Sequence, residues 1–201
     1  MVCAICEIRR PKRYCPGVRG EICTLCCGAE REETVNCPLD CPFLRQARER
    51  EKGGTLDAKT MPNADIEISN KFLEENAGLL EILSISLFHA SIETAGAIDY
   101  DVREALESLI QTYRTLQSGI YYETRPRNPL AAEIGRLAKA AIAEFGEHRK
   151  IRDAAILGVL VFLQRIELNR NNGRKKGRAF IDLLRTFFPE EEAAEPSLVL
   201  L

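Results

Sequence analysis

All eight cysteines of this 201-residue chain lie within its first 41 residues. They are Cys3, Cys6, Cys15, Cys23, Cys26, Cys27, Cys37 and Cys41. A segment of about 50 residues buries too little apolar surface to fold unaided, so cross-links or bound metal must supply much of its folding free energy. The abrupt change in cysteine content therefore predicts a small N-terminal module followed by a cysteine-free domain.

Metal binding is the expected use of these thiols. Disulfides need an oxidising compartment, and the basic N-terminus, MVCAICEIRRPKR, lacks the apolar core of an export signal. The longest apolar run, residues 154–163, has about half the length that crosses a bilayer. We therefore expect a cytoplasmic protein without membrane contact, in which clustered, reduced cysteines are metal ligands. Disulfide or redox use is the alternative.

The spacing of the cysteines predicts two closed zinc sites. Two C-x2-C pairs and one C-x3-C pair form short loops, each of which lets two sulfurs converge on one ion. Adjacent cysteines tend to point apart, so Cys26 and Cys27 are expected to serve different ions. The first zinc is then assigned to Cys3, Cys6, Cys23 and Cys26, and the second to Cys15, Cys27, Cys37 and Cys41. An iron–sulfur cluster is the alternative cofactor, because all-thiolate ligation also suits iron.

The layout CxxC…YCP…CxxC, with Tyr14-Cys15-Pro16 in the middle, resembles small cross-brace zinc modules. It is most similar to the HIT-type zinc finger, which carries the same tyrosine–cysteine–proline step. The resemblance covers about a fifth of the chain, and the histidine ligand usual in that family is missing here. It implies a zinc-stabilised module that mediates contacts between proteins.

The fold class that we expect is mostly α. A cysteine-rich zinc-binding module occupies residues 1–52, a linker 53–65, a helical bundle of about five helices 66–189, and a disordered acidic tail 190–201. Apolar residues recur at helical spacing after the linker, and no segment alternates convincingly as a strand. Such helices, joined by short loops, make an orthogonal or up-and-down bundle.

Individual residues predict where the helices begin. Ser69 is a plausible N-cap for a helix that runs to the neighbourhood of Gly96, and Asp99 for the next helix. Asn128-Pro129 is a cap followed by proline in the first helical position. Asp153 opens the most apolar helix, and a short last helix holds Phe180, Leu183, Leu184 and Phe187.

A basic loop is the first candidate site outside the cysteine module. The stretch NRNNGRKKGR, residues 169–178, has five basic residues, no acidic residue and two glycines. Arg174, Lys175, Lys176 and Arg178 together with exposed helix amides suit a phosphate or nucleic acid. The alternative, which we favour, is an ordinary solvated loop between two helices.

Two further features have a structural and a functional interpretation. Tyr121 and Tyr122, near Arg125 and Pro126, are residue types that anchor interfaces, but we expect the rings to pack onto the bundle and Arg125 to bond helix-end carbonyls. His89 and His148, the only histidines, each share a helix face with a glutamate. Surface histidines paired with carboxylates are the favoured interpretation, because the Glu-x-x-His spacing of bundle metal sites is absent.

Three functions are compatible with these patterns. The favoured one is a protein–protein interaction or regulatory adaptor with a structural two-zinc module. The second is a nucleic-acid-binding regulator that uses the basic loop 170–178. Residues 1–52 hold ten Lys and Arg against eight Asp and Glu, and two zinc–tetrathiolate centres add about −2 each, so the module is a poor phosphate binder. The third, an enzyme of unknown class, has no recognised catalytic motif in its favour.

Overall fold

The computed structural model describes residues 1–51, 61–147 and 149–187. These residues are mostly helical, with eight α-helices, a short 3-10 helix and two short strands. The mostly α fold class is therefore confirmed, whereas the expected number of about five helices is too low. The cysteine-rich segment itself contains two helices, and the first helix expected in the bundle is divided into two.

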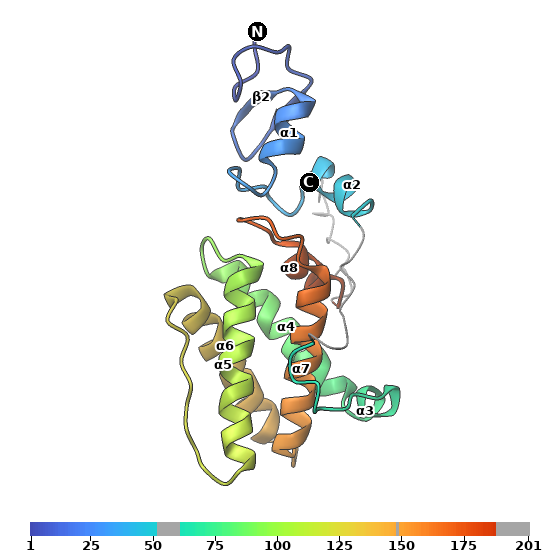
Figure 1. The fold of residues 1–201 in the computed structure, drawn as a ribbon, viewed down its shortest axis with the longest axis vertical. Coiled ribbons are helices and arrows are strands. Elements are labelled where there is room, and N and C mark those ends of the chain that lie inside the picture. The colour runs from blue at the N-terminus through green and yellow to red at the C-terminus, as the bar shows by residue number, and fades with distance from the viewer. Residues whose placement is uncertain (52–60, 148, 188–201) are drawn as a thin grey trace, which may run out of the picture.

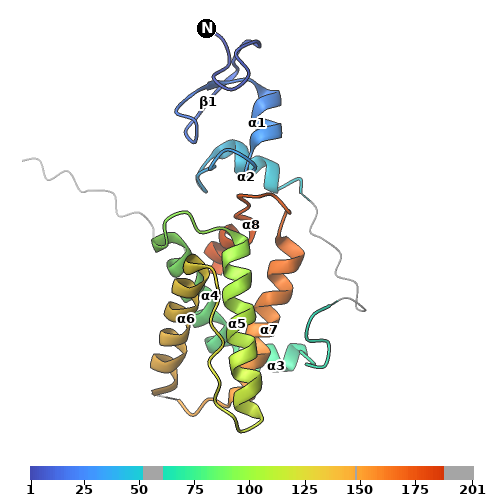
Figure 2. The same cartoon turned by 60° about the vertical axis from the view of Figure 1, so that its left-hand side comes forward.

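Four long helices make up the bundle: α4 (Ala77–Glu93), α5 (Asp99–Gln117), α6 (Pro129–Glu147) and α7 (Asp153–Arg170). α5 packs against both α6 and α7, and α4 packs against α6. α4 and α7 run toward the N-terminal module, and α5 and α6 run away from it (Figures 1 and 2). Since α5 and α6 are parallel, the connection 118–128 has to return along the length of the bundle.

Local sequence signals set several helix boundaries as expected. The Ser69 hydroxyl accepts a hydrogen bond from the Phe72 amide and caps α3 (Asn70–Glu75). The Asn128 side chain accepts a bond from the Leu130 amide at the start of α6. The helix begun at Ser69 does not continue to Gly96, because Asn76 leaves the helical conformation with φ −115° and ψ 20°. α4 then starts as a separate helix.

Asp99 differs from its expected role. It is the first residue of α5, but its carboxylate caps a different helix, α8 (Ala179–Leu184), by accepting bonds of 3.0 Å from the Phe180 and Ile181 amides. The start of α5 is instead held by Asp101, whose carboxylate accepts the Ile98 amide. α8 continues into the 3-10 helix η1 (Arg185–Phe187), and both pack on α4.

The cysteine-rich segment lies at one end of the bundle (Figure 1). It contains an antiparallel pair, β1 (Arg13–Cys15) and β2 (Gly20–Ile22), followed by α1 (Thr24–Glu30) and α2 (Pro42–Arg48). Gly17, in the turn between the strands, lies so close to the chain at 35–36 that a Cβ atom there would be 2.6 Å from the Asn36 carbonyl oxygen. The buried cysteines and Ile22 form an apolar cluster separate from the bundle core.

The segment that precedes α3 is tied to the bundle. Arg114 of α5 donates to the Asn63 and Asp65 side chains, and Arg165 of α7 donates to the Asn63 and Ile66 carbonyls. Residues 61–65, assigned to the linker from sequence, thus contact two bundle helices. The rest of the linker, His148 and the tail 190–201 lie outside the described residues. No helix among the described residues has the length and apolar character to cross a membrane.

Candidate metal centre

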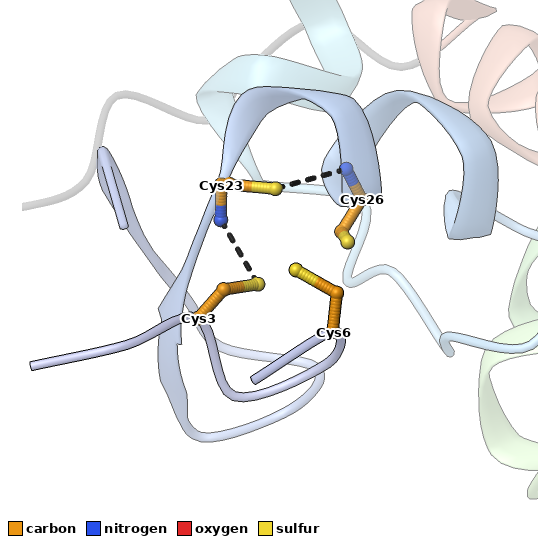
Figure 3. Close-up of side chains that lie close together, drawn as sticks. All are labelled: Cys3, Cys6, Cys23 and Cys26. Carbon is orange, nitrogen blue, oxygen red and sulfur yellow. Dashed lines mark hydrogen bonds between the residues drawn. The ribbon is translucent and has the colours of Figure 1, made fainter. Parts of the chain in front are cut away.

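Four thiols from two distant parts of the chain converge on one point. The Sγ atoms of Cys3, Cys6, Cys23 and Cys26 all lie within 4.8 Å of one another (Figure 3). Tetrahedral zinc with Zn–S bonds of about 2.3 Å has sulfurs about 3.8 Å apart, so the cluster is close to the size that the ion requires. These are the four residues that the sequence assigns to the first site.

Backbone amides orient these sulfurs. Cys23 occupies the N-cap of α1, and its sulfur accepts a hydrogen bond of 3.4 Å from the Cys26 amide. The Cys23 amide in turn donates to the sulfur of Cys3 at 3.2 Å. The first loop closes with Glu7 at φ 55°, where its amide donates to the Cys3 carbonyl. Each short loop therefore points sulfurs inward while its amides stabilise negative charge on them.

The same amides control the acidity of the thiols. Burial raises the pKa of Cys3, but the amides of Cys6, Cys23 and Ile5 outweigh this effect and lower the pKa to about 6. Burial, together with the neighbouring sulfurs, raises the pKa of Cys26 to about 12. Four crowded thiols cannot all ionise without a cation between them, whereas a bound divalent ion stabilises all four thiolates. The chemistry of the donor set therefore fits a metal ion.

The other four cysteines are less tightly grouped. Cys15, Cys27, Cys37 and Cys41 line one small cavity of about 20 Å³. Burial raises the pKa of Cys37; a hydrogen bond from the Glu32 backbone opposes this, and the charges of the Glu32 carboxylate and of Cys15 and Cys41 add to the increase. Among the described residues, only the cluster at Cys3 brings three or more Cys, His, Asp or Glu ligand atoms within the 4.8 Å spacing. Of the two zinc sites predicted from sequence, only the first therefore has its four sulfurs as close together as a bound metal ion requires.

The basic loop has a structural use. The Arg174 guanidinium donates to the Arg31 carbonyl, just past the end of α1, and the Lys176 ammonium donates to the Thr34 carbonyl at 2.6 Å. The Arg178 amide donates to the Glu32 carboxylate at 3.0 Å. Lys175 is exposed. Three of the four cations named from sequence thus lie where the bundle meets the cysteine-rich segment, so the loop is not simply solvated.

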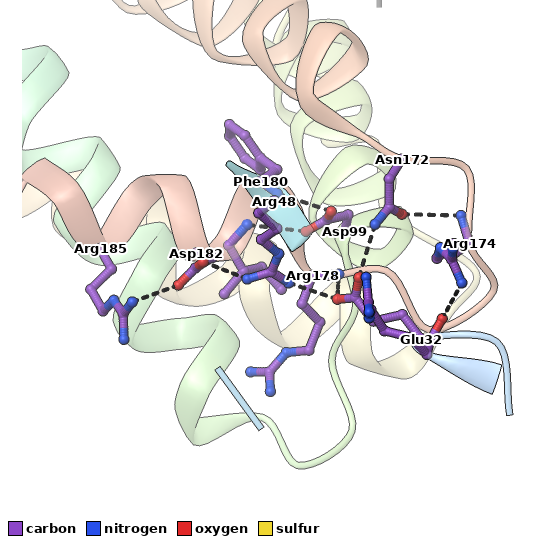
Figure 4. Close-up of polar contacts among 11 residues, drawn as sticks. Glu32, Arg48, Asp99, Asn172, Arg174, Arg178, Phe180, Asp182 and Arg185 are labelled. Atoms are coloured by element: carbon purple, nitrogen blue, oxygen red, sulfur yellow. Dashed lines mark hydrogen bonds and ion pairs between the residues drawn. The ribbon is translucent and has the colours of Figure 1, made fainter. Parts of the chain in front are cut away.

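Glu32 is the centre of this contact, and sequence reasoning did not identify it. Its side chain is only 1% exposed and accepts bonds from Arg48 at 2.6 Å, from Asn172 at 2.8 Å and from the Arg178 amide (Figure 4). Its carbonyl accepts the Lys176 amide at 2.7 Å. Arg48 also pairs with Asp182 of α8. Glu32 has a left-handed φ of 53°, which aims both acceptors at the bundle.

The tyrosine pair and the histidine have separate surroundings. The expected packing of the two tyrosines is wrong: Tyr121 is 61% and Tyr122 65% exposed. Both rings lie on the solvent side of the connection, and Arg125 pairs with Glu123 at 3.8 Å instead of with helix-end carbonyls. His89 is exposed on α4 and belongs to no metal-sized group among the described residues.

Comparisons of this chain with protein-family models, with curated proteins and with solved structures give no match. The similarity to HIT-type zinc modules therefore stays a prediction, and the functional argument depends on the geometry of the chain itself.

Proposed function

We propose that this chain is a zinc-binding protein in which the cysteine-rich segment is a structural module and the helical part serves as an interaction adaptor. The observation that carries the proposal is the convergence of four buried or half-buried cysteine sulfurs within 4.8 Å. Four thiolates complete a tetrahedral shell and leave no position for water or substrate, which is typical of structural zinc. Zinc is favoured over an iron–sulfur cluster because the ligands come from paired loops without a C-x2-C-x2-C run.

A second zinc ion is part of the proposal. Cys15, Cys27, Cys37 and Cys41 line one cavity that has room for a single small ion. The Arg13 guanidinium lies over the Phe43 ring at 4.0 Å and donates to the Cys27 sulfur at 3.7 Å, so an N–H donor is already in place for a metal-bound sulfur. Thiolates attracted by an ion are expected to close the remaining distance, since metal binding and folding are coupled.

Elemental analysis tests both sites on protein purified without added metal. We expect two zinc ions per chain, and one each in Cys6→Ser and Cys37→Ser. Iron with visible absorption would support the cluster alternative. One zinc in the unsubstituted protein, retained in Cys37→Ser, would limit the metal to the first site, and the absence of metal would refute the proposal.

Exposed apolar side chains support the interaction role. Ile120, Tyr121 and Tyr122 are consecutive, and each is more than 60% exposed. Tyrosine is enriched at the energetic centres of protein interfaces. The nucleic-acid alternative is less favoured, since the Arg174 and Lys176 side chains donate to backbone carbonyls of the cysteine-rich segment.

Affinity capture with the zinc-loaded chain separates the two roles. A protein partner retained after nuclease treatment is the expected result. Capture that depends on nucleic acid, with salt-sensitive retention on heparin, would favour the second role instead. A Lys175→Ala variant is the matched probe, because this cation alone among the four is exposed.

A further inference from the structure

A groove of about 540 Å³ lies between α5, α6 and the returning connection 118–128. Its floor consists of small or apolar side chains, among them Ala105, Leu109, Ala132 and Gly135. Volumes in this range and apolar floors are typical of binding sites. The exposed Ile120, Tyr121 and Tyr122 belong to the connection that forms one wall.

The connection presents an unpaired backbone edge. Its Thr124 amide donates to the Thr112 hydroxyl at 3.0 Å, and its Tyr122 carbonyl accepts from the Thr115 hydroxyl at 3.2 Å. In extended chain, alternate residues direct their backbone groups to opposite sides. Glu123 and Arg125 therefore direct theirs away from α5, and within the described residues these groups make no hydrogen bond. Such an edge is what an added peptide strand pairs with.

Polar groups in the groove favour an acidic peptide. Three cations, Arg125, Arg136 and Lys139, line it against two carboxylates, Glu123 and Glu133. Each cation pairs with one of these carboxylates, which leaves the lining one net positive charge, although the whole chain has a net charge of −2. Lys139 is bonded to the Tyr121 hydroxyl at 2.9 Å and paired with Glu123 at 3.2 Å, so its ammonium is held at the groove.

One hydroxyl that lines the groove makes no hydrogen bond within the described residues. Ser108 of α5 is 8% exposed, and it lines the groove. Other helical hydroxyls of this chain, such as those of Ser84, Ser91 and Thr112, donate to the carbonyl four residues earlier, but the Ser108 hydroxyl makes no hydrogen bond within the described residues. The Ser108 oxygen is not among the fully buried unpaired polar atoms of the described residues, so it is accessible from the groove and offers a hydrogen-bonding group to a bound peptide.

We propose that this groove binds an extended, acidic peptide segment of a partner protein. The peptide backbone pairs with the free edge of Glu123 and Arg125, small apolar side chains lie on the alanine and glycine floor, and a carboxylate reaches Lys139. This inference rests on the proposed interaction role and names the surface and the kind of partner.

Selection from a displayed library of random peptides about twelve residues long, long enough to span the groove, tests the inference on the zinc-loaded full chain. We expect enriched sequences with an acidic residue beside small apolar residues. The affinity of one synthetic enriched peptide is then measured by fluorescence anisotropy against the unsubstituted chain and its variants.

Two pairs of variants locate the site. Ala132→Leu fills the floor of the groove, and Ala140→Leu adds the same side chain at an exposed position of the same helix. Lys139→Glu reverses a charge in the groove, and Lys150→Glu does so at an exposed position outside it. We expect the groove variants to weaken binding by about tenfold or more and the controls to change it by less than about twofold.

The outcomes distinguish this inference from the proposed function. The groove assignment is overturned if no peptide is enriched, or if the peptide binds Ala132→Leu and Ala140→Leu equally well. In either case, zinc content and capture of a protein partner still test the proposed adaptor role. Enriched peptides that are basic or that bind independently of Lys139 also overturn it. Circular dichroism and zinc content equal to those of the unsubstituted chain show that each variant is folded.

Discussion

Replacing Glu32 by glutamine removes one charge from the contact between the cysteine-rich segment and the bundle while keeping the side-chain shape. The carboxylate accepts three hydrogen bonds and is almost fully buried, and its partner Arg48 is only 12% exposed. Glutamine has one acceptor oxygen in place of two, and its NH2 group would face one of the N–H donors that now bond to the carboxylate. Breaking a buried ion pair by removing one partner costs about 3–5 kcal/mol. Because Arg48 keeps Asp182, we expect the lower end, about 3 kcal/mol.

Hydrogen exchange reports this loss at particular amides. The amides of Lys176 and Arg178 donate to Glu32 itself, so their protection measures whether the contact is formed. A loss of about 3 kcal/mol corresponds to about a 150-fold faster exchange of these two amides if they exchange through local opening. Glu33→Gln is the matched control, because Glu33 is adjacent and its carboxylate makes no hydrogen bond or ion pair within the described residues.

Equal behaviour of Glu32→Gln and Glu33→Gln would contradict this role of Glu32. Equal protection of the Lys176 and Arg178 amides in both variants, with urea midpoints that differ by less than the error, would show that Glu32 does not hold the two parts together. Zinc content has to be equal in both variants, so that a change in exchange is not caused by loss of metal.

Two further predictions concern the bundle. Burial raises the pKa of Asp99 to about 7, above its value in the unfolded chain, so ionisation destabilises the fold as pH rises from about 4 to about 7. Urea unfolding of the unsubstituted chain and of Asp99→Asn measures this effect. Relative to the variant, the unsubstituted chain is expected to lose about 2 kcal/mol of unfolding free energy between pH of about 5.5 and 7.5. A difference in unfolding free energy between the two proteins that does not change with pH would contradict this. Gly158→Ala places a methyl group 2.4 Å from the Phe72 ring and is expected to cost about 1–3 kcal/mol, whereas Gly146→Ala, with open space around it, is expected to be neutral or stabilising.

Sequence periodicity predicted the long helices well where an apolar face recurs at helical spacing, as in α5 and α6. α7 was readable from its apolar content instead, because residues 155–161 are buried on every side of that helix. Caps at Ser69 and Asn128 were equally readable, since a side chain that bonds an amide two or three residues later is a local interaction. The role of Asp99 was not readable. Its partners, the α8 amides, lie about 80 residues away in the chain, and nothing at Asp99 separates a cap for its own helix from a cap for another. The strands β1 and β2 were missed because three residues are too few to show alternation.

The two sulfur pairs of the Cys3 cluster were predictable for the same local reason, since each C-x2-C loop brings its own two sulfurs together. The contacts of the basic loop were not predictable, because the composition of a segment gives the number of its cations but not the groups that they contact. Arg174 and Lys176 bond backbone carbonyls of the cysteine-rich segment, and carbonyls leave no signal in a sequence. Glu32 was missed because one glutamate among several in EREE carries no pattern that marks it as buried.

The position of Glu32 links metal binding to the contact between the two parts. Glu32 lies in the chain between Cys27 and Cys37. Cys41 is the N-cap of α2, and Arg48 is the last residue of that helix. Any ion held by Cys27, Cys37 and Cys41 therefore fixes the chain on both sides of Glu32 and at the base of the Arg48 helix. The ion pair between Glu32 and Arg48 needs both of these segments in place. If the proposed second ion binds, we therefore expect its occupancy to support the docking of the bundle, whereas an ion at the Cys3 cluster would mainly fold the outer end of the module.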